Sequence, residues 1–428
     1  MKSISIYIHI PFCVKKCQYC DFLSAPADSR AQEVYLRALK QEIREQAARY
    51  REYEVQTVFI GGGTPTAVPC ENLCEVLKTV FSFYRMNPHA EISMEANPGT
   101  VTKEALLSYR KAGINRISIG LQSADDMELK LLGRIHTYRD FQQTYRWAQE
   151  AGFTNINLDI MSALPGQSVE NYKKTLETVL SLKPQHISAY SLIVEEGTPF
   201  YEKYGQESEK LQATGEKQPD LPSEEEEREM YALTEKLLAA AGYHRYEISN
   251  YALPGRECRH NLVYWKRGNY VGFGLGAASM VENVRFENIR EMQEYLAEYA
   301  CMPDAEPVFA EVAQGDAQVL SNEQEFSLRE DTHSENEQEL SIRENVHPLS
   351  LQEQMEETMF LGLRLTEGVS KAEFHRQFGV SMEQIYGEVI RKNTAKGLLI
   401  DEAGYIRLTR EGMDLSNYVM AQFLLDEV

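Results

Sequence analysis

Apolar and polar positions alternate in short runs through the first half of the chain, and longer helical patterns separate these runs. Between residue 2 and about 195, segments with the two-residue period of a strand precede segments with the 3.6-residue period of an amphipathic helix. This order is typical of βα units, whose strands pair in parallel. We expect strands at 3–10, 56–61, 90–95, 116–121, 155–160 and 186–193. The pattern therefore predicts an α/β fold with a partial (β/α)6 barrel as its core, within residues 1–205.

The pattern changes after the barrel. Residues 206–302 begin with a polar, acidic stretch and continue with a helical pattern from about 224 to 241. Tyr-rich and Gly-rich sequence follows at 243–283, which favours hairpins and loops. We therefore expect 206–302 to form a smaller α+β region that extends the barrel.

The last two regions differ sharply in composition. Residues 303–347 contain twelve Asp and Glu against Arg329 and Arg343, together with a short acidic repeat, so we expect a disordered insertion. Residues 348–428 return to helical patterns, followed by a hairpin at 398–408 and a final helix. This order predicts a winged-helix-like domain, whose excess of acids favours a structural or docking role over DNA binding.

Charge and cysteine content narrow the classes of function. The formal net charge is -21, which disfavours a nucleic-acid partner because phosphate backbones are bound by clustered Lys and Arg. No apolar run is long enough to suggest a membrane span, and the alternating start does not resemble a signal peptide. Seven cysteines, three of them within eight residues, fit metal binding in a reducing compartment better than disulfides. We therefore expect a cytoplasmic protein.

Distinctive polar and glycine residues follow the ends of the predicted strands. In parallel α/β folds the carboxyl ends of the strands meet at one rim, where active sites lie. The residues expected at this rim are Cys13, Cys17 and Cys20, the Gly61–Pro65 segment, Glu95, Gln122 and Asp159.

The cysteines have the spacing Cys13-x3-Cys17-x2-Cys20. Three thiolates leave one iron of a [4Fe-4S] cube without a protein ligand, so that iron can bind another molecule. A zinc site is the alternative, and it requires a fourth ligand, for which His9 is available.

The segment Tyr7-x-His9-x-Pro11-Phe12-Cys13-x3-Cys17-x2-Cys20 resembles the signature of the radical SAM superfamily, in the subgroup related to anaerobic coproporphyrinogen oxidase. The resemblance implies that S-adenosylmethionine (SAM) chelates the open iron through its amino and carboxylate groups. It also implies that an external electron donor reduces the cluster, which then cleaves SAM to methionine and a 5'-deoxyadenosyl radical.

The same resemblance assigns a set of SAM contacts. Glycines allow a ligand to approach the backbone, and carboxylates suit cationic and hydroxyl groups. Taken singly, the carboxylates fit helix caps, the arginine a surface ion pair and the glycines an ordinary turn. The positions implied by the resemblance are Tyr7, Gly62, Gly63, Thr64, Glu95, Gln122, Arg134 and Asp159.

A second motif lies at 258–265, Cys-Arg-His-Asn-Leu-Val-Tyr-Trp. It is similar to the His-Asn-x-x-Tyr-Trp motif of HemW-type haem chaperones, and it implies haem contacts at His260, Asn261, Tyr264 and Trp265. Histidine is a common axial ligand of haem iron, and aromatic rings offer flat apolar surface. The alternative for His260 is a core histidine that is hydrogen-bonded within the protein.

Two functions follow from the resemblance. The first is a haem chaperone that delivers haem to acceptor haemoproteins, membrane-associated respiratory enzymes among them. The alternative is an oxygen-independent coproporphyrinogen III oxidase-like radical SAM enzyme. Those oxidases carry another cysteine two residues after the third ligand and an N-terminal extension, whereas Asp21-Phe22 follows Cys20 here and the first strand begins at residue 3. Both departures favour the chaperone.

Overall fold

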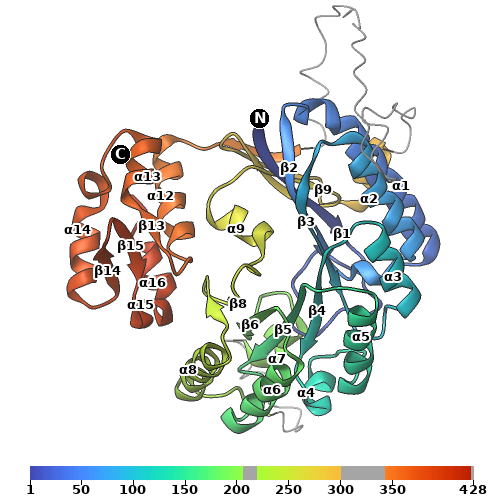
Figure 1. Ribbon diagram of the computed structural model, residues 1–428, viewed down its shortest axis with the longest axis horizontal. Helices are drawn as coiled ribbons and strands as arrows, with labels where there is room; N and C mark the ends of the chain where they lie inside the picture. Colours follow the sequence, from blue (N-terminus) through green and yellow to red (C-terminus); the bar gives the residue numbers. More distant parts are fainter. Residues whose placement is uncertain (206–218, 300–342, 426–428) are drawn as a thin grey trace, which may run out of the picture.

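The computed structural model describes residues 1–205, 219–299 and 343–425, and its largest element is one curved sheet (Figure 1). Within these residues twelve strands pair in the order β12-β11-β10-β9-β1-β2-β3-β4-β5-β6-β8-β7. The central six strands pair in parallel in chain order. They are β1 (Lys2–Ile10), β2 (Tyr53–Gly62), β3 (Met86–Ala96), β4 (Arg116–Gln122), β5 (Ile156–Ser162) and β6 (His186–Ser191). The predicted partial barrel is confirmed.

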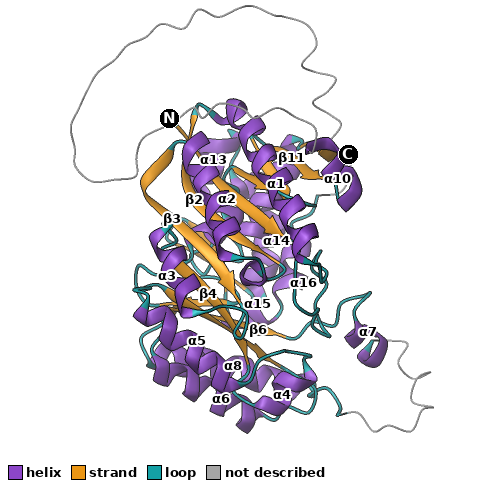
Figure 2. Cartoon of the chain, turned by 90° about the vertical axis from the view of Figure 1, so that its right-hand side faces the viewer, coloured by secondary structure: helices purple, strands orange, loops and turns teal. Residues whose placement is uncertain are grey.

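Helices alternate with these strands and cover the outer face of the sheet, as Figure 2 shows for α2, α3 and α5. Most begin at a side chain that accepts a backbone N–H, such as Asp28 before α1 and Ser168 before α6. The helices are α1 (Ser29–Gln46), α2 (Cys70–Phe83), α3 (Lys103–Lys111), α4 (Asp126–Leu131), α5 (Tyr138–Glu150) and α6 (Val169–Leu182), with the short η1 (Ala47–Tyr50) and η2 (Pro65–Ala67).

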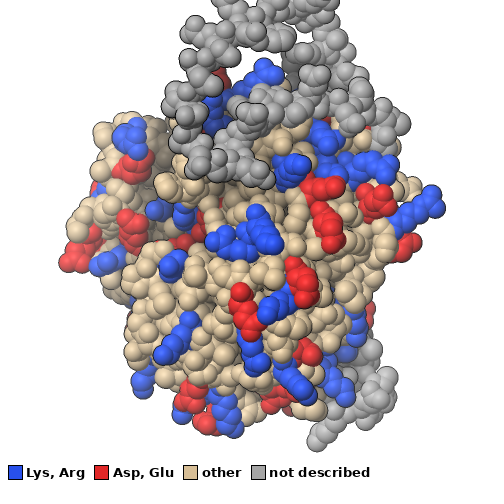
Figure 3. Space-filling view, turned by 45° about the vertical axis from the view of Figure 1, so that its right-hand side comes forward, with Lys and Arg blue, Asp and Glu red and all other residues tan. Residues whose placement is uncertain are grey.

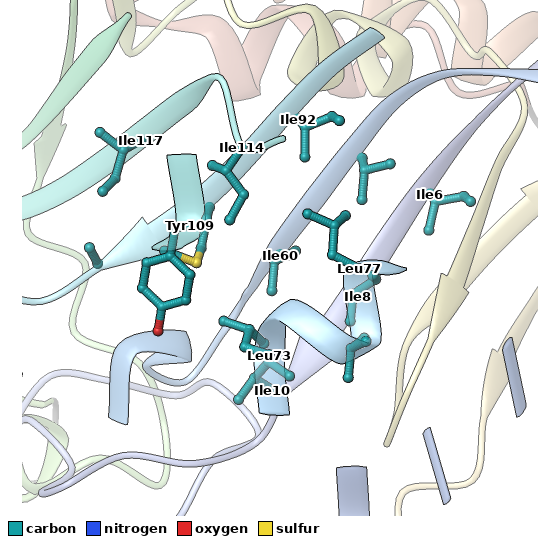
Figure 4. Packing of buried hydrophobic residues seen from close by; sticks show 14 of the residues in the cluster. Ile6, Ile8, Ile10, Ile60, Leu73, Leu77, Ile92, Tyr109, Ile114 and Ile117 are labelled. Atoms are coloured by element: carbon teal, nitrogen blue, oxygen red, sulfur yellow. The ribbon is translucent and has the colours of Figure 1, made fainter. Parts of the chain in front are cut away.

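The two faces of β1 meet different surroundings, because side chains alternate along a strand. Its isoleucines point outward and are buried against the helices, whereas Ser5, Tyr7 and His9 occupy the alternate positions. Figure 4 shows the outward packing of strands β1 and β2 against α2 through Ile6, Ile8, Ile10, Ile60, Leu73 and Leu77. The apolar core therefore lies between sheet and helices, and the barrel interior is polar.

Residues after the barrel strands extend the same sheet at both edges. Strand β9 joins parallel to β1, and β10, β11 and β12 follow antiparallel. On the other side β8 and β7 pair beside β6. These elements are α7 (Pro199–Tyr204), α8 (Glu224–Ala240), β7 (His244–Arg245), β8 (Asn250–Ala252), α9 (Arg259–Trp265), β9 (Tyr270–Phe273), β10 (Ala278–Val281), β11 (Val284–Asn288), α10 (Met292–Tyr299) and β12 (Arg343–Pro348).

Two local predictions need correction here. Hairpins and loops were expected throughout 243–283, but helix α9 lies within that stretch and carries the His260 motif. The acidic insertion was expected to run to residue 347, but Arg343–Pro348 forms a strand because it finds a partner in β11. The remainder of that insertion, 303–342, lies outside the described residues, as does 206–218.

The C-terminal part has its own apolar core and a three-stranded sheet in the order β13-β15-β14. The predicted hairpin is present, with its turn at Ala403 and Gly404. Helices followed by this hairpin agree with the winged-helix-like prediction. The elements are α12 (Leu351–Gly362), β13 (Val369–Ser370), α13 (Lys371–Phe378), α14 (Met382–Ala395), β14 (Leu399–Glu402), β15 (Tyr405–Leu408), α15 (Arg410–Asp414) and α16 (Ser416–Ala421).

A buried ion cluster joins this C-terminal part to the sheet, with α9 lying between them in Figure 1. Glu357 of α12 accepts hydrogen bonds from Arg267 Nε at 3.0 Å and from Arg285 Nε at 2.7 Å. Arg267 follows α9 and Arg285 lies in β11. A charge this buried is stable only while it is paired, so the cluster fixes the C-terminal part against the sheet.

The surface of the described residues carries charges of both signs. On the face in Figure 3, Lys and Arg side chains lie among Asp and Glu side chains. Among the helices of the described residues, none has the combined length and apolarity needed to cross a bilayer.

Removing the carboxylate at the centre of the ion cluster should destabilise the protein. We expect Glu357→Ala to lower the free energy of unfolding by about 3 kcal/mol, because two arginines lose their buried partner. The exposed Glu373, which pairs with Arg376, provides the control, and Glu373→Ala should have little effect. Denaturant unfolding curves of the two variants test this, and equal midpoints would contradict a stabilising cluster.

Candidate functional site

The three cysteines lie in one loop that follows β1, and all three are free thiols of intermediate burial. Backbone hydrogen bonds close this loop, from Cys13 N to Ala25 O at 3.1 Å and from Ala25 N to Pro11 O at 3.0 Å. Burial raises the pKa of the Cys20 thiol to about 11, so metal binding there has to release a proton.

The geometry argues against zinc at this loop. His9, the fourth ligand considered, has both ring nitrogens engaged, with Tyr7 OH at 3.0 Å and Leu23 O at 2.9 Å. Within the part of the chain that the structure describes, no three His, Cys, Asp or Glu side chains converge on a single-ion site. An iron–sulfur cube holds its thiolates on separate irons, so three cysteines around an open cavity suit it better.

One cavity of about 320 Å³ brings most of the expected residues together at the carboxyl ends of the strands. It joins the cysteine loop to the ends of β2, β3, β4 and β5. The expected residues that line it are Cys13, Cys17, Cys20, Gly62, Gly63, Thr64, Glu95, Gln122, Arg134 and Asp159.

Gly63 and Thr64, directly after β2, hold the cysteine loop in place. Gly63 N donates to Ile10 O at 2.8 Å, and Thr64 N donates to Phe12 O at 2.6 Å. A Cβ on Gly63 would lie only 2.5 Å from Phe12 O, so this glycine permits close approach of protein backbone as well as of a ligand. Gly62 has a φ of +108° and also requires glycine.

Arg134 connects the cysteine loop to the opposite wall of the cavity. Its guanidinium donates to Asn97 Oδ1 at 2.6 Å and to Gly120 O at 2.9 Å, and it lies 3.6 Å from Cys17 Sγ. Asn97 in turn donates to Thr64 Oγ1 at 2.8 Å. The guanidinium thus links the cysteine loop to Asn97, directly after β3, and to Gly120 of β4.

The two carboxyl groups of the cavity, Glu95 and Asp159, are partly buried. Burial, with the nearby charge of Asp159, raises the pKa of Glu95 to about 8, and Gly62 N donates to its Oε2 at 3.2 Å. Burial also raises the pKa of Asp159, although Ser118 and Asn157 donate to its two oxygens at 2.8 Å. At neutral pH Glu95 therefore keeps its proton in the free protein. A cationic or hydroxyl-bearing ligand can bind to this neutral carboxyl.

Gln122 adds strained backbone to the cavity wall. Its φ is +71°, in the left-handed region that residues other than glycine rarely adopt. Such a conformation costs on the order of 1 kcal/mol and is typical of functional sites.

A second cavity of about 210 Å³ adjoins the first, and both are lined by Glu95, Ser118, Asp159 and Tyr190. Tyr7, expected as a SAM contact, lines this second cavity and not the first, and its hydroxyl is bonded to His9. It does so because its place on β1 directs its side chain into the barrel. Burial raises the pKa of Tyr7 well above its usual value.

Helix α9 brings His260, Asn261 and Tyr264 of the expected haem motif to the second cavity. His260 is 1% exposed, and its Nδ1 and Nε2 lie 2.7 Å from Thr57 Oγ1 and 2.8 Å from Tyr264 OH. Burial, together with the charge of Arg116, lowers the pKa of His260 to about 3, so its ring is neutral. These contacts match the alternative of a hydrogen-bonded core histidine.

Trp265 does not reach either cavity. Its ring lies under the guanidinium of Arg364, 4.3 Å from the centroid, on the side of α9 that faces the C-terminal part. The helical period separates it from His260, because consecutive side chains of α9 point in different directions.

Several residues that line the two cavities were not predicted from the sequence. Asn97 follows β3, two residues after Glu95. Ser118 lies in β4, two residues before Gly120, and Tyr190 is the second-last residue of β6. The alternation of side chains along each strand, with every second residue facing the barrel interior, could have predicted them.

The raised pKa of Glu95 predicts a pH effect on stability. In the unfolded chain this carboxyl ionises near pH 4.5, whereas in the folded protein it keeps its proton up to about pH 8. Stability therefore falls as pH rises through this window, by at most about 1.4 kcal/mol per unit from this group. We expect Glu95→Gln to lose less stability between pH 5 and pH 8 than the unmodified protein. Unfolding curves on protein free of cofactors measure this, and identical pH slopes would contradict it.

Two family models and several known proteins match this chain. A family model described as the radical SAM superfamily matches residues 7–179, and a HemN C-terminal domain model matches 349–415. The "Heme chaperone HemW" of Bacillus subtilis is 36% identical over 98% of this chain and 99% of that protein. The HemW of Lactococcus lactis is 33% identical over 100% and 99%.

A solved structure shows the same fold. The coproporphyrinogen III oxidase HemN from Escherichia coli, described as a radical SAM enzyme, superposes with a TM-score of 0.76 at 21% identity, over 99% of this chain and 90% of that one. At this identity the likeness establishes the fold alone. The end-to-end sequence similarity to curated relatives goes further, and the chain belongs to the HemW family of the radical SAM superfamily.

Proposed function

We propose that this protein is a haem chaperone that carries a [4Fe-4S] cluster and SAM and delivers haem to acceptor haemoproteins. The observation that carries the cofactor part is the cavity that unites three free cysteines with glycine backbone, an arginine and two partly buried carboxyls. The haem part is supported by the full-length relatives that bear the name heme chaperone.

The residues present fit both cofactors. Cys13, Cys17 and Cys20 would hold the cluster, and the cavity beside them would hold SAM against its open iron. When bound, the cluster supplies electrons to SAM. Arg134 stays close to Cys17 and keeps the loop attached to Asn97, while Glu95 and Asp159 offer oxygens to the ligand's hydroxyl and cationic groups.

Haem would be a cargo next to this site. Helix α9 supports the proposal because it holds His260, Asn261 and Tyr264 at a cavity that adjoins the cofactor cavity. Since both nitrogens of His260 are hydrogen-bonded, iron ligation requires the His260–Tyr264 bond to open. A neutral imidazole is the form that binds iron, and the low pKa keeps it available at any physiological pH.

The proposed surroundings follow from the same chemistry. Thiolates that hold an iron–sulfur cluster must stay reduced, which supports a cytoplasmic location. An electron donor for the cluster and acceptor haemoproteins, including membrane-associated respiratory enzymes, complete the proposed set of partners, and no nucleic acid is among them.

An oxygen-independent coproporphyrinogen III oxidase-like activity is the second candidate, and the shared fold with HemN favours it. Titration of the anaerobically reconstituted protein with haem and, separately, with coproporphyrinogen III distinguishes the two. We expect a shift of the haem Soret band and no turnover of coproporphyrinogen III. Oxidation of the porphyrinogen without haem binding would refute the chaperone.

Cluster assembly should depend on the three loop cysteines. We expect Cys17→Ala to abolish the absorption at about 400 nm that Fe–S clusters show after anaerobic reconstitution. Cys70→Ala is the matched control, since Cys70 is a free thiol at the start of α2, and it should keep full iron content. Equal iron content in both variants would remove the cluster from this loop.

Replacing His260 separates haem contact from structural support. If His260 contacts haem, His260→Ala should weaken haem binding at least tenfold per folded molecule. It should also cost roughly 1 to 3 kcal/mol of stability, because Thr57 and Tyr264 lose their partner. Haem titration and melting curves on one preparation test both effects. Normal haem affinity in the destabilised variant would assign His260 to the core alone.

A further inference from the structure

Arg116 opens β4 and carries the largest fully buried side chain among the described residues. Its side chain points into the barrel and lines the second cavity, and the residue is only 2% exposed. Its Nε has no hydrogen-bond partner. Among the described residues no carboxylate lies within salt-bridge distance of the guanidinium. Buried arginines are normally paired, because five N–H donors are costly to leave without acceptors.

The carboxylates near Arg116 accept hydrogen bonds from donors other than its guanidinium. Glu91 accepts hydrogen bonds from Arg259 N at 3.1 Å and from His260 N at 3.2 Å, at the start of α9. Asp159 accepts from Ser118 and Asn157. These carboxylates balance the charge of Arg116 over a longer distance, but their oxygens do not receive its N–H groups.

The cavity beside Arg116 has the size and lining of a site for a small polar group. It measures about 210 Å³, which suits a short acid and is small for a macrocycle. Two acidic side chains line it besides Arg116: Glu95, whose raised pKa of about 8 keeps it protonated at neutral pH, and Asp159, whose two oxygens accept hydrogen bonds from Ser118 and Asn157. The other polar side chains are neutral, and the flat rings of Phe59 and His260, stacked 5.2 Å apart, offer apolar surface for a short carbon chain. The hydrogen-bonding side chains are Tyr7, Ser118, Asn157, Ser188, Asn261 and Tyr264.

Access to this cavity comes from the cofactor site and from α9. Tyr190 lines both cavities and is exposed, and Asn261 and Tyr264 are only partly buried. A ligand that occupies the larger cavity, or that lies on α9, can therefore extend a side arm toward Arg116.

We propose that the second cavity binds a carboxylate group, which Arg116 receives through its guanidinium. A carboxylate matches the planar fork of arginine with two parallel hydrogen bonds. The carboxylate belongs either to a free short-chain acid or to the arm of a larger ligand, such as a propionate of haem. The second source rests on the proposed function, whereas the first does not.

Propionate and its neutral analogue propionamide test the site directly. By calorimetry, the full-length protein should bind propionate at least tenfold more tightly than propionamide, and Arg116→Met should abolish this preference. Arg139→Met, which removes an exposed arginine, is the control and should keep it. Because loss of a buried charge can impair folding, Arg116→Lys serves as a second variant, which keeps the charge, loses the fork and should bind with reduced preference.

Haem and haem dimethyl ester, in which both propionates are neutral, test the second source. If an arm of haem occupies the cavity, the protein should bind haem at least tenfold more tightly than the ester, and only the Arg116 variants should lose this difference. Preference for propionate without discrimination between haem and ester assigns the site to a free acid. Propionate binding without any haem binding does the same and refutes the chaperone proposal.

Two outcomes would overturn the carboxylate site. The first is that the unmodified protein binds propionate no more tightly than propionamide and haem no more tightly than its dimethyl ester, whatever the variants do. The second is an acid preference that survives in folded Arg116→Met, because the carboxylate would then bind elsewhere.

Discussion

Polar groups inside the barrel must find hydrogen-bond partners, because a buried donor or acceptor left alone costs about 1 to 3 kcal/mol. Asn157 shows how the chain meets this demand. Its amide donates to Ser118 and Asp159 and its oxygen lies 2.5 Å from His186 Nδ1. His186 continues to Tyr246 OH at 2.8 Å. This chain of bonds crosses β4, β5 and β6, so the orientation of Asp159 depends on residues far from the cavity that it lines.

The sequence pattern predicted the barrel well because each βα unit carries its own periodicity. Strand β1, expected at 3–10, spans Lys2–Ile10, and the hairpin expected at 398–408 is present. Helix α9 escaped prediction since its seven residues are too short for a helical period to be distinguished. Strand β12 escaped it because its pairing with β11 joins segments that are distant in the chain.

The candidate site was predictable to the extent that strand ends define it. Cysteine spacing, the carboxyl ends of β2 to β5 and the family resemblance identified about half of the residues that line the larger cavity. The direction of a side chain and its partners were not predictable in the same way. Tyr7 turned to His9, Gly63 packed against Phe12, and Arg116 was overlooked, because each depends on which strand or loop lies opposite.

Helix α9 is anchored by a carboxylate near each end. Glu91 of β3 accepts the N–H groups at its beginning, and Glu357 of α12 binds Arg267 just beyond its end. The helix thus connects the barrel rigidly to the C-terminal part. Any displacement of α12 must break the Arg267–Glu357 pair or pull on α9. A protein that docks on the C-terminal part and displaces α12 would therefore also displace His260 and change the shape of the cavity behind it.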